Sequence, residues 1–304
     1  MKKENNLPKR IDSLTELHKM LGLPKPQHPL ISVFNHQTNA MEMRPPQGVH
    51  VLNFYKISFA ESLNGMVQYG QGYYDFDDGG MLFASPNQII GSETNDITPE
   101  FVLLIHPDFL LGYPIFKKIK QYNFFTYSVH ESLHLSEQEK KTVIKIFSIL
   151  EEEINNRIDE FSQEIVVSQI ELLLNYCQRF YKRQFITRNA VNSEIISKLD
   201  DIIESYIAKN LPLENGLPTV QYLSDQLYIT PGYLSDLLRA QISQSTSQYI
   251  QSKFLEKAKE KLSTTNISIG EIAMELGYKH SQTFSKLFKS KTKQSPLEFR
   301  NSFN

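Results

Sequence analysis

The stretch Ile267–Phe288, ISIGEIAMELGYKHSQTFSKLF, decides the fold of the C-terminal part of this chain. Its first half repeats apolar residues at i, i+3, i+4 and i+7, which predicts a short amphipathic helix with Ser268 as the N-cap. Gly277 then supplies the left-handed conformation that ends a helix at low cost. A second helix follows, and we expect Ser281 to cap it. The pattern therefore predicts a helix-turn-helix.

The second helix of this pair has an apolar side formed by Phe284, Leu287 and Phe288, and a polar side that we expect to face outward. The outward residues are Gln282, Thr283, Ser285, Lys286 and Lys289. Amides, hydroxyls and ammonium groups suit base edges and phosphates, which offer acceptors, donors and negative charge. For this segment alone, two packed helices with a solvated outer face remain an equally good interpretation.

An upstream segment, Thr219–Ala240, repeats the pattern. Thr230 is the expected cap of its second helix, and Pro231 stands in the first turn, where a missing N–H costs nothing. Between the two units, Thr246–Leu262 is an uninterrupted helical stretch roughly 25 Å long at ~1.5 Å per residue. Two recognition helices on such a strut could enter successive major-groove turns, which repeat every ~34 Å.

The region 193–303 resembles the DNA-binding domain of AraC/XylS-type transcription regulators. The motifs that carry the resemblance are YLSDLL (Tyr233–Leu238), SQYI (Ser247–Ile250), AKEKL (Ala258–Leu262), ISIGEIAMELGY (Ile267–Tyr278), TFSKLFK (Thr283–Lys289) and SPLEFR (Ser295–Arg300). The resemblance implies a seven-helix all-α domain in which both recognition helices contact DNA. The expected DNA-binding residues, from the resemblance and the outward faces together, are Gly232, Tyr233, Ser235, Asp236, Arg239, Ser281, Gln282, Thr283, Lys286 and Lys289.

Three positions depart from the family pattern. Phe254 replaces the usual arginine, and Ser243 and Lys293 stand where glycines are usual. Because glycine reaches positive φ without strain, we expect these two turns to be strained or differently shaped. Asp236 would also repel phosphate, so base reading by the first unit is less certain than by the second.

Composition sets ordinary bounds on the class of protein. The 304 residues are 40% hydrophobic, which suggests two domains, and the formal net charge is only −2. Lysines crowd the C-terminal end, although solvated surface lysines would look the same.

Cys177 is the single cysteine, so no internal disulfide forms, and its apolar setting indicates a buried helix position. The sequence contains no apolar run of ~20 residues, and we expect a cytoplasmic protein.

Short alternating segments between residues 31 and 106 break at Gly, Pro, Asn and Asp, with a strong turn signal at Asp77-Asp78-Gly79-Gly80. Strands at this spacing predict a small barrel or jelly roll. The family resemblance implies that this is a cupin-like β-barrel, at about residues 30–130 of a two-domain α+β chain. A small-molecule effector could occupy its mouth. Candidate lining residues are Tyr69, Tyr73, Tyr74 and Phe83. Strand aromatics belong to the core at least as often, so both interpretations stand.

The segment His130–His134, HESLH, matches the zinc-protease pattern HExxH. That motif works only on a helix, where the two imidazoles converge on one metal. The preceding residues suggest β-structure, and Ser136 with Glu139 marks the start of a helix just afterwards. His36 and His50 are too scattered for a metal-binding cupin set. We therefore expect no metal, no catalytic residues and no cofactor.

Two longer helices are expected at 137–154 and 161–181, within a helical region at about 136–185. The second is apolar on more than one stripe, which suggests either an antiparallel-helix homodimer or burial of both helices against the barrel and each other. We expect residues 1–185 to form a sensor or dimerisation domain, 186–193 a linker and 194–304 the DNA-binding domain.

The sequence thus predicts a transcription regulator, not an enzyme, that binds double-stranded DNA. The family tendency favours an activator that contacts RNA polymerase under control of the N-terminal domain. Two alternatives stay open. One is a constitutive DNA-binding protein without an effector, and the other is a metal-dependent hydrolase centred on HESLH.

Overall fold

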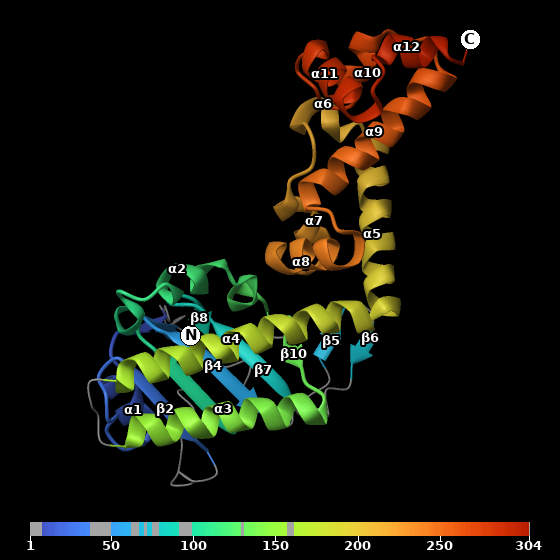
Figure 1. Ribbon diagram of the computed structural model, residues 1–304. Coiled ribbons are helices and arrows are strands. Elements are labelled where there is room, and N and C mark those ends of the chain that lie inside the picture. The colour runs from blue at the N-terminus through green and yellow to red at the C-terminus, as the bar shows by residue number, and fades with distance from the viewer. Residues whose placement is uncertain are drawn as a thin grey trace, which may run out of the picture. The chain divides into compact units, whose positions relative to one another are not determined.

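The computed structural model describes residues 8–36, 50–61, 67–69, 72–74, 79–90, 99–128, 131–156 and 161–303. The chain divides into two units, Met1–Gln184 and Phe185–Asn304 (Figure 1). Among the described residues, no helix is both long and apolar enough to cross a membrane.

A five-stranded antiparallel sheet forms the centre of the N-terminal unit, with the strand order β10-β7-β4-β9-β2. The strands are β2 (Ile31–Asn35), β4 (Tyr55–Ala60), β7 (Gly80–Ala84), β9 (Phe101–Ile105) and β10 (Leu133–His134). The first four were expected from their apolar alternation. β4 is the middle strand and pairs with β7 on one side and β9 on the other.

Two smaller sheets complete the described β-structure. One contains β1 (Lys9–Ile11), β3 (His50–Leu52) and β8 (Ile89–Ile90), and the other is the pair β5 (Val67–Tyr69) and β6 (Gly72–Tyr74). No backbone ladder joins the three sheets into a ring within the described ranges, so the cupin-like barrel is not confirmed. Alternation predicts that a segment is a strand, but it does not fix which edges pair. Of the turn expected at Asp77-Asp78-Gly79-Gly80, the two aspartates lie outside the described residues, while Gly79 has a φ of 53° and Gly80 begins β7.

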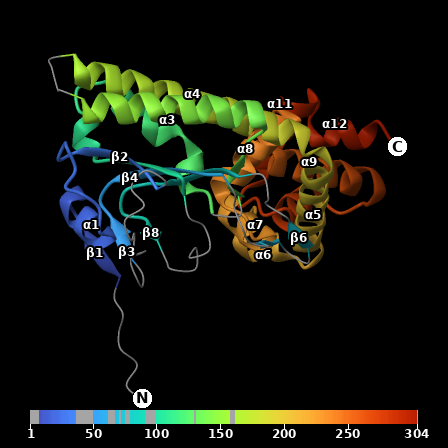
Figure 2. The same ribbon diagram turned by 90° about the horizontal axis from the view of Figure 1, so that it is seen from below.

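The helices α3 (Glu137–Asn155) and α4 (Ser162–Thr187) cover one face of the five-stranded sheet, as Figure 2 shows from below. Side chains at alternate strand positions meet them or the loops beside them: the ring of Phe101 stacks 5.3 Å from Phe147, and that of Tyr55 lies 5.1 Å from Phe125. The loop region contains η2 (Pro107–Leu110), α2 (Ile115–Lys118), η3 (Ile119–Gln121) and η4 (Asn123–Thr126). The opposite face meets β3 and α1 (Leu14–Leu21) through an apolar cluster.

The capping box predicted at the start of α3 is confirmed, with Ser136 and Glu139 bonded reciprocally to each other's backbone N–H. α4 continues six residues beyond the expected end at Tyr181. Cys177, on this helix, is fully buried, and burial raises the pKa of its thiol, which agrees with a structural role.

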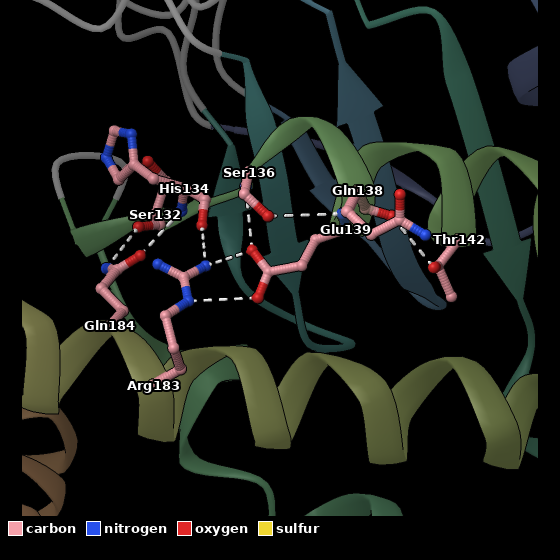
Figure 3. A network of polar contacts seen from close by, with 8 residues as sticks. All are labelled: Ser132, His134, Ser136, Gln138, Glu139, Thr142, Arg183 and Gln184. Carbon is pink, nitrogen blue, oxygen red and sulfur yellow. Dashed lines mark hydrogen bonds and ion pairs between the residues drawn. The ribbon is translucent and has the colours of Figure 1, made fainter.

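The last turns of α4 are attached to the sheet by a polar network, which Figure 3 shows from close by. Arg183 donates to Glu139 at 2.5 Å and to the backbone oxygen of His134 at 2.8 Å. Gln184, almost completely buried, accepts from the N–H of His134 at 2.8 Å and donates to the oxygen of Ser132 at 3.1 Å. Its amide thereby satisfies backbone groups along the edge of β10.

The C-terminal unit is all helical. Its helices are α5 (Asn189–Ala208), α6 (Leu211–Asn215), α7 (Val220–Leu227), α8 (Pro231–Ile242), α9 (Thr246–Thr264), α10 (Ile269–Glu275), α11 (Ser281–Thr292) and α12 (Pro296–Asn301). The resemblance implied seven helices, and the additional one is the five-residue α6. α5 begins at Asn189, so residues 189–193 of the expected linker form its first turns.

Several turns of this unit use left-handed backbone at residues other than glycine. Tyr228, Ser243 and Lys293 have φ values of 57°, 59° and 66°. The expectation of strained turns at the last two positions is confirmed, because positive φ costs a non-glycine residue about 1–2 kcal/mol. Gly277, with φ of 82°, ends α10 in the same conformation without that cost.

Gly277 is also a point of close approach. A Cβ atom there would lie 2.9 Å from both the oxygen of Pro212 and the Cα of Gly216. The backbone of α6 therefore lies against the turn of the second helix-turn-helix. The hydroxyl of Tyr206, on α5, donates to the oxygen of Gly216 at 3.2 Å and holds the same loop.

We predict opposite effects for two substitutions at left-handed positions. Ser243→Gly should raise the free energy of unfolding by about 1 kcal/mol, because the exposed serine loses its strain. Gly277→Ala should lower it by about 2 kcal/mol or more, because a methyl group meets backbone as well as an unfavourable φ. Denaturant unfolding followed by circular dichroism measures both. A Gly277→Ala protein as stable as the parent would contradict the close approach.

Candidate nucleic-acid interface

The first helix-turn-helix consists of α7 and α8. Thr219 caps α7 through a bond from the N–H of Tyr222 at 3.1 Å, and Thr230 caps α8 through a bond from the N–H of Tyr233 at 3.3 Å. Pro231 stands in the first turn of α8, as expected. Three apolar side chains of α8 are fully buried and form part of the core of this unit: Leu234, Leu237 and Leu238.

Two expected outward residues of α8 are engaged inside the unit. Tyr233 is only 5% exposed, and its ring lies 5.1 Å from that of Phe185, so its expected outward position is wrong. The Ser235 hydroxyl donates to the oxygen of Pro231 at 2.8 Å and lies 3.2 Å from the hydroxyl of Thr246. Neighbouring elements, not the period of α8 itself, cover these two positions.

The remaining candidates of α8 carry opposing charges. Arg239 is 61% exposed, and its guanidinium lies 3.5 Å from the carboxylate of Asp236, one turn earlier. Gly232, in the first turn, is half-buried. The carboxylate lowers the positive potential beside Arg239, so α8 presents little net charge to an anionic partner.

The second helix-turn-helix consists of α10 and α11. Ser268 forms the predicted cap of α10, in a capping box with Glu271. α11 differs from the expectation at its start, because His280 is the N-cap residue and Ser281 is the first residue of the helix. No side chain caps α11, whereas a Ser or Thr hydroxyl caps each of α7, α8, α9, α10 and α12. The first amides of α11 thus keep their bonding capacity for an anion.

The expected contact residues of α11 are exposed together: Ser281, Gln282, Thr283, Lys286 and Lys289. Phe284 and Phe288 anchor the opposite side of the helix and are buried, with Phe288 5.4 Å from the ring of Phe299 on α12. The predicted division of α11 into an apolar inner side and a polar outer side is confirmed. Lys279 and His280, just before the helix, are exposed too and were missed, because they precede the periodic segment.

Three of the four lysines of α9 form ion pairs, Lys259 being the exception, and this distinguishes them from the lysines of α11. On α9, Lys253, Lys257 and Lys261 pair with Asp200, Glu260 and Glu275 at 2.9, 2.7 and 2.7 Å. Arg300 is used structurally, since it donates to the backbone oxygen of Ile267 at 2.7 Å. Within residues 161–303, the lysines in and beside α11 form no ion pair with a carboxylate: Lys279, Lys286, Lys289, Lys291 and Lys293. The positive charge of the unit therefore concentrates at α11.

α9 is the long connecting helix that the sequence predicted. Its 19 residues span about 28 Å at ~1.5 Å per residue. Its inner side is buried along its whole length, at Tyr249, Ile250, Phe254, Ala258 and Leu262. Phe254, which stands in place of the family's arginine, is 1% exposed and acts as a core residue.

The HESLH segment does not have the geometry of a zinc-protease site. Leu133–His134 form strand β10, whereas the motif requires a helix. Glu131 is buried, and its carboxylate accepts from the N–H of Ser128 at 2.8 Å. His130 lies outside the described residues. In the part of the chain that the structure describes, no three side chains of His, Cys, Asp or Glu gather as a metal site.

Of the four aromatic residues that could line a ligand pocket, only Phe83 has a described side chain. Phe83 is half-buried and packs against the buried rings of Phe124 and Phe125 on the helix-covered face, 4.6 and 5.5 Å away between ring centroids. The side chains of Tyr69, Tyr73 and Tyr74 are outside the described residues.

The sequence of this chain is similar to those of known helix-turn-helix proteins. A family model described as a helix-turn-helix domain matches residues 223–302. The uncharacterized HTH-type transcriptional regulator YfiF of Bacillus subtilis is 25% identical over 281 residues, covering 89% of this chain and 84% of that protein. The regulatory protein SoxS of Salmonella typhimurium is 28% identical over 109 residues, covering 36% of this chain and 95% of that protein.

Among solved structures, a transcriptional regulator of Chromobacterium violaceum described as having an AraC-type DNA-binding domain is similar to 38% of this chain and 96% of that one. Its sequence identity is 18% and the TM-score is 0.34.

We predict that Lys289→Ala lowers affinity for all duplex sequences and reduces the slope of log affinity against log salt by about one unit, because one phosphate contact is lost. Lys257→Ala is the matched control, since Lys257 is already paired with Glu260. Titrations of fluorescent duplex DNA over a range of salt concentrations measure both slopes. Equal slopes for the parent and Lys289→Ala would place this lysine away from the DNA backbone.

Proposed function

We propose that the C-terminal part of this chain, whose residues 223–302 match a helix-turn-helix family, is an AraC-type DNA-binding domain, and that the protein is a transcription regulator whose α11 is its main reader of a specific duplex site. The observation that carries the proposal is the outer side of α11. It combines unpaired lysines, an exposed amide and hydroxyls, and first-turn amides without a side-chain cap.

The groups of α11 divide into two roles. Gln282 and Thr283, near the N-terminal end, have the chemistry to meet base edges, because an amide pairs bidentately with adenine and a hydroxyl bonds to either groove edge. Lys286 and Lys289 have the charge to meet phosphates on either side of the groove. The N-terminal end of a recognition helix is the part that reaches base edges in helix-turn-helix proteins.

α8 has a lesser role in this proposal. Tyr233 and Ser235 are engaged within the unit, and Asp236 offsets Arg239. Arg239 and the backbone at Gly232 are the groups that remain for DNA. We infer that α8 positions the protein on the duplex through the DNA backbone, whereas α11 supplies most of the base preference.

The N-terminal unit is proposed to control this activity, with the protein acting as an activator that contacts RNA polymerase, as is the tendency of the family. α4 supports a homodimer, because Ile165 and Leu172 on it, and Phe161 just before it, are exposed at helical spacing. Glu164 lies near one end of α4 and Arg179 toward the other, so an antiparallel copy would meet opposite charges.

Selection of bound duplexes from a random library tests the function, with the full chain and the 186–304 fragment in parallel. We expect an enriched motif with one strongly specified half and one weakly specified half about a helical turn apart. A repeat of this motif for the full chain alone would support the homodimer. No enrichment with either protein, even at low salt, would refute the regulator.

We predict that Gln282→Ala relaxes preference at one base position and weakens specific binding by ~1–3 kcal/mol. Ser235→Ala is the matched control on α8, and it should leave base preference unchanged, because its hydroxyl is bonded within the unit. The same library, selected with each variant, measures both. A Gln282→Ala motif identical to the parent motif would exclude this residue from base reading.

A further inference from the structure

The N-terminal unit contains a lysine at the centre of its main sheet. Lys56 lies in β4, the middle strand, and is paired in register with Ala84 of β7 and Leu104 of β9. Two residues along, Ser58 is paired with Leu82 and Val102. Since side chains two apart on a strand share a face, the ammonium and the hydroxyl belong to the same side of the sheet.

That side is the one turned away from α3 and α4. The alternate β4 residues Tyr55 and Ile57 belong to the opposite, helix-covered face, where Tyr55 meets Phe125. On the side of Lys56, the neighbours Leu104 and Val102 join an apolar cluster with residues of β1, α1 and β3. Figure 2 shows these elements on the far side of the sheet from α3 and α4. The lysine is thus set among aliphatic side chains.

No described carboxylate balances this charge. Burial lowers the pKa of Lys56, and neither an ion pair nor a hydrogen bond to a described residue offsets it. The hydroxyl of Ser58 is buried and forms no hydrogen bond. His18 and Ser32, on the same side of the sheet, satisfy each other at 2.8 Å and are not available to either group. Lys56 is only half-buried, so its ammonium can reach a ligand, whereas proteins rarely leave a buried hydroxyl such as that of Ser58 unsatisfied, because this costs free energy.

We propose that Lys56 and Ser58 bind the carboxylate of a small molecule that has an apolar body. One ammonium and one hydroxyl match a monoanion with two acceptor oxygens, whereas a phosphate or sulfate dianion needs more donors. The surrounding aliphatic side chains suit an apolar body, and a sugar would leave its hydroxyls without partners there. The site is therefore a carboxylate anchor in a mostly apolar surrounding.

The position of the anchor suggests a route to regulation, and this part of the inference rests on the proposed function. β4 pairs with β7, and β7 pairs with β10 at Leu133 and His134. β10 in turn holds the end of α4 through Arg183 and Gln184 (Figure 3). A ligand that stiffens β4 and β7 acts on the two strands that lead to this attachment.

Calorimetric titration of the full chain tests the anchor with octanoate and benzoate as probes, each beside its neutral counterpart, 1-octanol or benzyl alcohol. We expect at least one carboxylate to bind and to raise the melting temperature, and its neutral counterpart to bind at least tenfold more weakly. Binding of octanoate alone would indicate a chain-like body, and binding of benzoate alone an aromatic one; both support the anchor.

Lys56→Met keeps the length of the side chain without the charge, and should weaken carboxylate binding at least tenfold. Lys117→Met, at an exposed lysine of α2, is the matched control and should bind like the parent. Ser58→Ala should weaken binding severalfold, which keeps the test sharp if Lys56→Met does not fold. Unchanged binding by either variant of the anchor, or no carboxylate binding by the parent, would overturn the proposal.

Duplex binding measured on the same proteins separates this inference from the proposed function. A parent protein that binds DNA but neither carboxylate refutes the anchor and leaves the regulator intact. A parent protein that binds a carboxylate through Lys56 but enriches no duplex supports the anchor and refutes the regulator.

Discussion

The buried side of α9 is the constraint on which the C-terminal unit depends. Tyr249 and Ile250 lie in its first turns, near α8, and Ala258 and Leu262 lie toward α10 and α12. Because one rigid helix contributes to the cores of both helix-turn-helix units, the spacing between α8 and α11 is fixed by its length. A break in this helix would separate two half-domains, neither of which buries much apolar surface alone.

That arrangement also decides where the charge of the unit lies. Three of the four lysines of α9 are neutralised by Asp200, Glu260 and Glu275, and Arg300 is bonded to a backbone oxygen. α11 carries no carboxylate, and its lysines point away from the core that Phe284 and Phe288 form. A chain with a net charge of only −2 thus offers one locally positive helix, which is what binding to a polyanion requires.

The two helix-turn-helix units have the same backbone conformation in their turns but use different residues there. Both turns contain a left-handed residue, Tyr228 in the first and Gly277 in the second. The tyrosine is 80% exposed and accepts backbone strain, whereas the glycine avoids it and permits close packing of α6. In the N-terminal unit, the half-buried Lys56 and the buried hydroxyl of Ser58 lie on one side of β4, and neither has a polar partner among the described residues.

Local features were determined by the sequence: the caps at Ser136, Thr230 and Ser268, the turn at Gly277, and the apolar side of α11. Each depends on residues within about one helical turn of each other, so periodicity and capping chemistry are enough to predict it. Contacts between distant segments decided the rest. Phe185 buries Tyr233, and acids on α5 and α10 pair Lys253 and Lys261 of α9. Among the described strands, pairing leaves the three sheets without a closed ring. Burial and pairing depend on which segments meet, and no local pattern in the chain specifies that.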